Sequence, residues 1–491
     1  MIKRNNKKGF TIVELVIVIA VIAILAAVLI PTFAGIIKKA NLSSDQQAVR
    51  NMNLALAADE ATNGKPQNLL EATMNMAKAG YDFENYKPLS SDHRFWWDQA
   101  NNRIVLADKS GNIIYPAEYE GKTLTAEFKS LYRDPLISTE KISAFEDKID
   151  AAASKTVEIE TADELAALSA LVNGETEAAK DFAGYTFNLK AGTTYNLAET
   201  VWVPVGEAEA APFRGTINGN GATISGLTTE GYTTDVANAS TLTSGQTGVT
   251  YGFVGYAENA TIKNLTFEGA NIQLGTTGKE MGLVVGTAIG GVTVENCTVT
   301  DSKIVGKSKV GGIVGYIEAE ETEYDEENPI VVIKNCHFDG TIEAKDKGDS
   351  VRAGGIVGAM VLSNKNHATI TGCTVSGKIV AEDIAGALVG HLYNSTGLKV
   401  DNCSVTATLE AEYTGAIVGY WANSGGCPVE IGANVTVGGA AITAPTDALF
   451  GLFYKNASYN MNVNESAYTF EREAESSGGD TADAWTEKAT T

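Results

Sequence analysis

Residues 292–299 read Val-Thr-Val-Glu-Asn-Cys-Thr-Val, and the spacing of the apolar residues in this stretch decides the fold. Apolar residues occupy the first and third positions, and then the sixth and eighth. The step between the two halves is three, so one continuous strand would place the halves on opposite faces. A bend at Asn296 keeps both halves inside, because asparagine and glycine adopt a left-handed backbone at low cost.

The bent element is repeated along the chain. Further copies are Ile262–Phe267, Ile333–Phe338, Ile370–Val375 and Val400–Val405. The residues at the bends are Asn264, Asn296, Asn335, Gly372 and Asn402. Between the copies lies a second element, a glycine, two or three apolar residues and a closing glycine, and successive closing glycines are 31, 29, 43, 32 and 29 residues apart. A period of this size indicates a solenoid or a propeller.

The bends favour a parallel β-helix, in which the chain turns inward at an asparagine or glycine corner once in each repeat. A propeller blade would need antiparallel hairpins, with turn signals between all of its strands. Over about residues 161–455 the repeats resemble those of bacterial surface proteins with glycine-rich GLUG motifs, and Phe213–Leu227 resembles the opening turns of such domains. That resemblance implies a right-handed β-helix on a cell-surface protein and transfers no catalytic residues.

Four of the five cysteines share one repeat position, directly after the bend: Cys297, Cys336, Cys373 and Cys403. Neighbouring turns of a β-helix lie about 4.8 Å apart, but parallel side chains make a disulfide awkward. We therefore expect a buried stack of reduced thiols, with Cys427 outside the pattern. No histidine or carboxylate recurs with these cysteines, so we expect no metal and no cofactor.

The N-terminus carries a second strong signal. Lys7-Lys8-Gly9 precedes an apolar run from Phe10 to Ile30, in which only Thr11 and Glu14 are polar. As a helix, these 21 residues would reach about 32 Å, enough to cross a bilayer. A carboxylate in lipid is costly unless it is paired, and the new amino group created by cleavage after Gly9 would supply a partner.

This segment resembles the N-terminus of type IV prepilins and pseudopilins. The resemblance implies that a prepilin peptidase cleaves after Gly9 and that Phe10 becomes N-methylated. It also implies that Glu14 pairs with the N-terminal amine of a neighbouring pilin subunit during assembly. A secretory signal would have a shorter apolar core with its cleavage site behind it, and a plain membrane anchor would leave Glu14 unexplained.

From these patterns we predict a mainly β chain: a right-handed parallel β-helix after a long pilin helix and a small α+β head. The predicted segments are a leader (1–9), a membrane and assembly helix (10–63), a pilin-like head with a small antiparallel sheet (64–150), a helical cap (151–180), the β-helix (181–464) and an acidic tail (465–491). The cap prediction rests on Thr161 and Glu164, which form a capping-box pattern before an apolar run.

A net charge of −23 disfavours nucleic acid as a partner. We expect a type IV pilin-like surface protein, a minor or tip subunit and not an enzyme, which displays an adhesive β-helix to a glycan or matrix ligand. It would pass once through the membrane before assembly and then lie at the cell surface or in a pilus filament. The alternatives are a membrane-anchored enzyme acting on polysaccharides and a pseudopilin of a secretion or DNA-uptake system.

The acidic run Glu318–Glu327 is expected to be a solvated loop, with calcium binding left open. The histidines are too far apart for a metal site and are expected at the surface or in turns: His93, His337, His367 and His391.

Overall fold

The structure is a computed structural model in which the chain forms two compact units. It describes residues 12–83, 86–132, 137–175, 178–198, 201–230, 232, 248–319, 330–345, 351–362, 367–393, 397–422, 429–432, 434–442, 449–453, 458–463, 466–471 and 486–487. The N-terminal unit comprises residues up to 66 together with 75–132, and the C-terminal unit comprises 67–74 together with 133 onward. Residues 133–150, which the sequence analysis assigned to the head, therefore group with the C-terminal unit.

Helix α1 (Ile12–Asn63) is 52 residues long and dominates the N-terminal unit. Its backbone stays helical through position 31, where the sequence places a proline. Apolar side chains in its first half are exposed, whereas Val49, Met52 and Leu56 in its second half are fully buried. In the described part of the chain, no helix meets both the length and the apolarity needed to span a membrane.

A small antiparallel sheet packs on the second half of α1. Its strands, in spatial order, are β3 (Ile113–Tyr115), β2 (Arg103–Asp108), β1 (His93–Asp98) and β4 (Phe128–Ser130). The Asn53 side chain of α1 joins this sheet, because its amide donates to the Ile104 carbonyl at 2.9 Å and accepts from the Ile104 amide at 2.7 Å. Trp97 on β1 is fully buried, and its indole donates to Asn102. The 3-10 helix η1 (Ala117–Tyr119) also belongs to this unit, whereas helix α2 (Leu69–Lys78) is divided between the two units after Met74.

The C-terminal unit opens with two helices and a few short strands. Helix α3 (Thr139–Asp150) buries Ile142, Phe145 and Ile149, and α4 (Ala162–Asn173) lies where the capping pattern predicts a helix. The Thr161 hydroxyl accepts from the Glu164 amide, and Gly174 ends α4 in the left-handed conformation. The strands that follow in space are β5 (Thr156–Ile159), β6 (Thr186–Leu189), β7 (Thr194–Asn196) and β8 (Thr216–Ser225).

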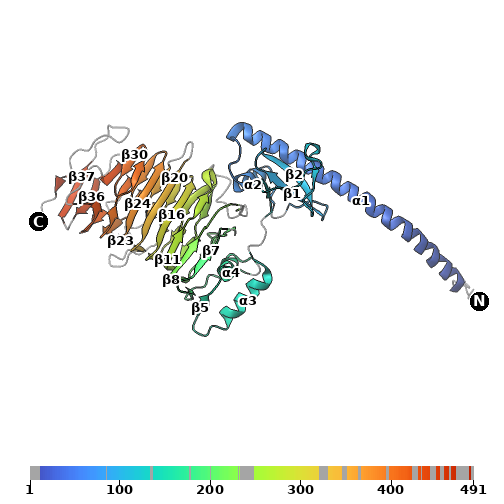
Figure 1. The fold of residues 1–491 in the computed structure, drawn as a ribbon, viewed down its shortest axis with the longest axis horizontal. Coiled ribbons are helices and arrows are strands. Elements are labelled where there is room, and N and C mark those ends of the chain that lie inside the picture. Colours follow the sequence, from blue (N-terminus) through green and yellow to red (C-terminus); the bar gives the residue numbers. More distant parts are fainter. Residues whose placement is uncertain are drawn as a thin grey trace, which may run out of the picture. The chain divides into compact units, whose positions relative to one another are not determined.

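Beyond β8 the repeats stack as parallel strands, which lie side by side from green to red in Figure 1. The six-stranded sheet contains β9 (Val249–Tyr251), β13 (Gly278–Gly282), β17 (Lys309–Gly311), β21 (Arg352–Gly354), β25 (Ile384–Gly386) and β30 (Tyr413–Gly415). The seven-stranded sheet contains β10 (Val254–Glu258), β14 (Val285–Ile289), β18 (Val314–Ala319), β22 (Val357–Leu362), β26 (Val389–Tyr393), β31 (Val418–Ala422) and β35 (Phe450–Phe453). The prediction of a mainly β chain with parallel sheets is confirmed.

The bent elements lie in the third sheet. Four of the five corners fall between two consecutive strands, whereas Asn264 lies within a continuous strand. Besides β5–β8, its strands include β11 (Thr261–Glu268), β12 (Asn271–Gln273), β15 (Val292–Glu295), β16 (Thr298–Gly306), β19 (Val331–Lys334), β20 (His337–Ala344), β23 (His367–Thr371), β24 (Thr374–Ala381), β27 (Gly397–Asp401), β28 (Ser404–Val405), β29 (Thr408–Glu410), β32 (Val429–Ile431) and β33 (Thr436–Val437). The last described strands pair antiparallel: β34 (Ala440–Ala441) with β33, β36 (Ser458–Val463) with β37 (Ser466–Glu471), and β37 with β38 (Thr486–Glu487).

The six- and seven-stranded sheets touch backbone to backbone at glycines. A Cβ atom on Gly358 would lie 2.5 Å from the Gly315 carbonyl oxygen and 2.6 Å from the Val310 amide nitrogen. Gly390 is crowded in the same way by the carbonyl oxygens of Gly358 and Ala353. The closing glycines Gly315, Gly358 and Gly390 are therefore required by backbone of the six-stranded sheet and of the neighbouring strand in their own sheet, since real Cβ atoms do not come this near to backbone.

This close approach predicts that Gly358→Ala destabilises the C-terminal unit by about 3 kcal/mol, because backbone on both sides of the new methyl group must shift. Ser376→Ala, an outward position on β24 of the same unit, is the control and should change stability by less than about 0.5 kcal/mol. Urea unfolding of the full chain, followed by tryptophan fluorescence, measures both. Equal midpoints for the two variants would contradict the close approach.

Candidate functional site

The residues predicted for processing lie at the extreme N-terminus. Gly9 and Phe10 fall outside the described residues. Glu14 lies in the first turn of α1, and its side chain is exposed to solvent in the single chain. An exposed carboxylate in this position can be reached by a neighbouring chain.

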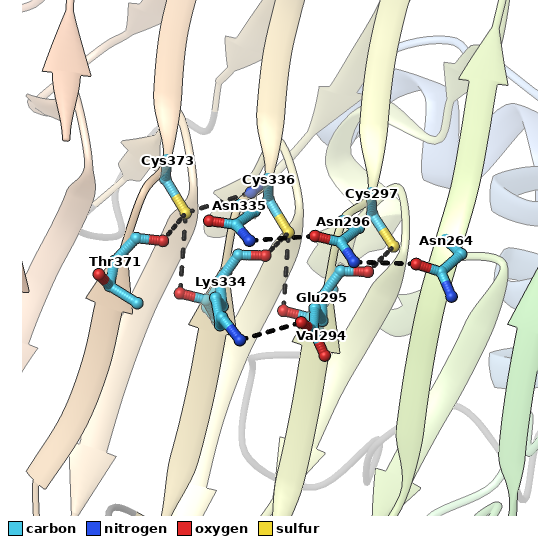
Figure 2. Close-up of polar contacts among 11 residues, drawn as sticks. Asn264, Val294, Glu295, Asn296, Cys297, Lys334, Asn335, Cys336, Thr371 and Cys373 are labelled. Carbon is cyan, nitrogen blue, oxygen red and sulfur yellow. Dashed lines mark hydrogen bonds and ion pairs between the residues drawn. The ribbon is translucent and has the colours of Figure 1, made fainter. Parts of the chain in front are cut away.

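The five predicted corner residues all have positive φ. The values are 59° for Asn264, 53° for Asn296, 51° for Asn335 and for Asn402, and 64° for Gly372. Figure 2 shows the asparagines joined in a ladder: Asn296 donates to Asn264 at 2.9 Å, and Asn335 donates to Asn296 at 3.1 Å. The ladder breaks at Gly372, where a Cβ atom would lie 2.3 Å from the Asn335 side-chain oxygen.

The ladder extends beyond the corners predicted from the sequence. Asn264 donates to Asn218 at 2.8 Å, and Asn434, with a φ of 60°, donates to Asn402 at 3.1 Å. Asn434 was missed because the apolar pattern around it is weaker than in the other copies. Each rung of the ladder satisfies one amide group of a corner that could otherwise be satisfied only by water.

The four repeat-position cysteines are buried and unbridged: Cys297, Cys336, Cys373 and Cys403. Each thiol lies 3.5–3.8 Å from a carbonyl oxygen of the preceding repeat, as Figure 2 shows for the Cys336 thiol and Val294. Each is also within 3.2–3.5 Å of the carbonyl two residues before it in its own repeat. The thiols are therefore accommodated by backbone acceptors. Cys427 falls outside the described residues.

Outward side chains of the six- and seven-stranded sheets face one another beside the glycine contact. We call this set the polar seam; it consists of Thr250, Tyr256, Glu280, Thr287, Lys309, Tyr316, Arg352, His391, Tyr393 and Tyr420. Thr250 hydrogen bonds to the Tyr256 hydroxyl at 3.0 Å, and the Lys309 ammonium lies 3.2 Å from the centre of the Tyr316 ring. The seam thus joins the two sheets through polar and cation–π contacts.

A buried ion pair lies at the centre of the polar seam. Lys309 donates to Glu280 at 2.8 Å, and the side chains of the two residues are 14% and 9% exposed. Thr287 and Thr250 donate to the other Glu280 oxygen at 2.9 and 3.2 Å. Burial acts to raise the pKa of Glu280, but the positive charges of Lys309 and Lys279 outweigh it and leave this pKa lowered. Burial outweighs the attraction of Glu280 and lowers the pKa of Lys309.

The C-terminal part of the polar seam is aromatic. His391 stacks on Tyr393, with ring centres 3.5 Å apart, and on Tyr420, with ring centres 4.3 Å apart. The Arg352 guanidinium lies 5.0 Å from the centre of the Tyr393 ring. His391 is only 1% exposed, so the expectation of a surface or turn histidine was wrong at this position.

The sequence analysis missed the polar seam, although a repeat alignment contains its signal. The residue after each closing glycine is Tyr256, Thr287, Tyr316, Ala359, His391 or Tyr420, a column rich in aromatic and polar residues. These positions show no fixed residue type, and only the contact between two sheets gives them a common role.

No group of three or more histidine, cysteine or acidic side chains in the described ranges could hold a metal ion. Most of the acidic run predicted as a solvated loop, residues 320–327, falls outside those ranges. The expectation concerning calcium there remains untested.

Comparison with known proteins identifies the N-terminal segment. Residues 4–30 match the prokaryotic N-terminal methylation motif, so the chain carries the motif of type IV pilins. Over 37 residues the chain is 67% identical to the type IV wide pilus major component PilA4 of Thermus thermophilus. This match covers 8% of the chain and 28% of that protein.

Two further proteins resemble larger parts of the chain. It is 33% identical over 165 residues to halomucin of Haloquadratum walsbyi, which covers 32% of the chain and 2% of halomucin. The chain therefore spans well under two thirds of either curated relative. A solved structure of a candidate immunoglobulin A1 protease from Bacteroides ovatus aligns with 64% of the chain and 84% of its own length, at 20% identity and a TM-score of 0.42.

The Glu280–Lys309 pair generates a stability prediction. Glu280→Gln should destabilise the C-terminal unit by about 3 kcal/mol at neutral pH, because it leaves the Lys309 cation buried beside a neutral group. Since the pKa of Glu280 is lowered on folding, its stabilisation is present above the unfolded pKa of about 4.3 and is lost as the pH falls through the folded pKa. Urea unfolding at a series of pH values measures both effects.

The control is the exposed pair Lys399–Glu430, whose side chains are 56% and 42% exposed. Glu430→Gln should change stability by less than about 1 kcal/mol. If Glu280→Gln were as mild as the control, or if it left the acid limb of the pH profile unchanged, the buried pair would not have the assigned role.

Proposed function

We propose that this chain is a pilin-like subunit that carries a right-handed, GLUG-type parallel β-helix outside the cell and uses it as an adhesive surface. The observation that carries the proposal is the union of an N-terminal methylation motif with a large, separately packed β unit. The motif supports a pilin or pseudopilin and a surface or pilus location. It also implies prepilin peptidase and other pilin subunits as partners.

The N-terminal helix would anchor the chain in the membrane before assembly, through the apolar residues that α1 exposes in its first half. Apolar residues that are exposed on a single chain are stabilised when they contact either lipid or the helices of neighbouring subunits, because both remove them from water. Glu14 lies among them, and pairing with the amine of a neighbour would remove the cost of its charge. This arrangement favours assembly over permanent residence in the bilayer.

The adhesive role without chemistry is supported by the polar groups of the C-terminal unit. Glu280 is held ionised by two lysines and two threonines, so it is poorly suited to act as a general acid. The net charge of −23 opposes nucleic acid and anionic membranes as targets. Glycans or matrix proteins are the ligands that remain, and several copies on one filament would gain avidity.

Processing gives the first test. Mass spectrometry of the native protein should find a chain that begins with N-methylated Phe10. Glu14→Ala should leave membrane insertion intact, since it removes a charge from an apolar segment, yet reduce the assembled fraction by tenfold or more because the pairing amine is left without a carboxylate. Thr11→Ala is the matched control and should assemble normally. An unprocessed Met1 terminus, or normal assembly of Glu14→Ala, would contradict the proposal.

Binding gives the second test. The full chain, kept in detergent and clustered on beads through a C-terminal tag, should bind glycan arrays or host cells at least 100-fold better than the monomeric chain, because clustering raises the effective concentration. The bound glycans should stay intact. Release of reducing ends would favour the polysaccharide-acting enzyme instead. No binding in clustered form would leave a structural role, such as that of a pseudopilin.

A further inference from the structure

Arg352 differs from the other buried cation of the polar seam in its partners. Lys309 has the Glu280 carboxylate at 2.8 Å, whereas no carboxylate in the described part of the chain forms an ion pair with Arg352. Tyr393 makes a cation–π contact and a side-chain hydrogen bond with Arg352, and Tyr420 lies nearby. The Asp383 carboxylate acts on Arg352 only from beyond ion-pair distance. Its Nε atom is buried and has no hydrogen-bond partner among the described residues. Among the described residues, this guanidinium therefore has no carboxylate in ion-pair contact, which is the partner that usually balances a buried arginine.

His391 adds two more unpartnered polar atoms at the same place. It is 1% exposed, and neither ring nitrogen has a hydrogen-bond partner within the described ranges. Burial, followed by the positive charges of Arg352 and Lys309, lowers the pKa of His391 well below its usual value. The ring is therefore neutral at physiological pH and offers one N–H donor and one acceptor.

These unpartnered polar groups destabilise the folded chain when no ligand is bound. Leaving a buried polar group without a partner costs about 1–3 kcal/mol, so a cluster of them is better explained by a ligand than by packing. Tyr393 and Tyr420 hold His391 between them and, like Arg352, keep part of their surface exposed. The cluster can thus be reached from solvent at its aromatic edge.

We propose that Arg352, His391, Tyr393 and Tyr420 bind a terminal uronic acid, a sugar that carries one carboxylate, at the end of a glycan. This inference rests on the proposed adhesive function and names the ligand class and the residues. The guanidinium pairs with the carboxylate, and the neutral imidazole hydrogen bonds to a carboxylate or ring hydroxyl oxygen. The tyrosine faces pack against the apolar C–H face of the sugar ring.

The combination of one cation with flat aromatic surface favours a sugar over an acidic peptide. A uronic acid is a rigid ring with an apolar face and a single charge, which matches one guanidinium beside two tyrosines. An acidic peptide carries several carboxylates, and the net charge of −23 would repel it. A terminal sugar brings its carboxylate to Arg352 at the smallest electrostatic cost.

The test uses the full chain in detergent micelles, with saturation-transfer NMR and calorimetry. Methyl β-glucuronide should bind, and methyl β-glucoside, the same ring without a carboxylate, should bind at least tenfold more weakly. Arg352→Gln should weaken glucuronide binding at least tenfold, whereas Arg352→Lys, which keeps the charge, should recover part of the loss. Tyr420→Leu should weaken both sugars alike, because it removes the stacking face.

Lys378→Gln is the control, since Lys378 is an exposed outward cation on β24 that pairs with Glu410. It should bind glucuronide as the unchanged chain does, and circular dichroism should show the same fold for every variant. The proposal is overturned if glucuronide does not bind, if glucoside or acetate binds equally well, or if Arg352→Gln binds unchanged. Tighter binding of an acidic hexapeptide would assign the site to a protein ligand instead.

The outcomes also separate this inference from the proposed function. If clustered protein binds neutral glycans on the array while glucuronide fails, the adhesive role stands and the site assignment is wrong. If glucuronide binds at this cluster while the clustered protein fails on arrays and cells, the site stands and the adhesive role is wrong.

Discussion

Close backbone contact between the six- and seven-stranded sheets is the constraint on which the rest of the C-terminal unit depends. At Gly358 and Gly390 one sheet rests directly on the backbone of the other, with no room for a side chain. Outward-facing positions next to these glycines, such as Lys309 and Tyr316, therefore meet each other instead of water. A face that would ordinarily be solvated becomes an interior, and its polar residues must find partners within it.

The C-terminal unit provides partners for its buried polar groups in three different ways: at the asparagine corners, at the buried thiols and in the polar seam. At the corners, identical asparagines form a ladder because parallel strands in register repeat the same amide at every turn. In the core, the thiols reach carbonyl oxygens of the preceding repeat. Residue types in the polar seam change from one repeat to the next. Each polar group there is therefore satisfied by a different kind of contact. The Arg352–His391 cluster is the part of the seam that the chain does not satisfy with its own described residues.

The features that could be predicted from the sequence are those set by a few neighbouring residues of one helix or strand. The odd step around Asn296 indicated a corner, and the structure gives that residue a φ of 53° and buries the apolar residues on both sides. The Thr161 capping pattern placed α4 in the same way. Contacts between sheets could not be predicted, because Glu280 and Lys309 lie 29 residues apart and share no local pattern. His391 was misread for a related reason: its ring is covered by Tyr420 on the neighbouring strand and by Tyr393 on its own, contacts that no local pattern announces.

The two parts of the chain place charge in opposite ways. Glu14 is a carboxylate among exposed apolar residues, and its partner would come from another subunit. Arg352 is a cation beside the partly exposed rings of Tyr393 and Tyr420, and a carboxylate in ion-pair contact would come from a ligand. In both places a charge in apolar surroundings raises the free energy of the isolated chain, and association with an oppositely charged group would lower it. Assembly through the first and adhesion through the second would therefore follow from the same physical cause, in the two units of one polypeptide.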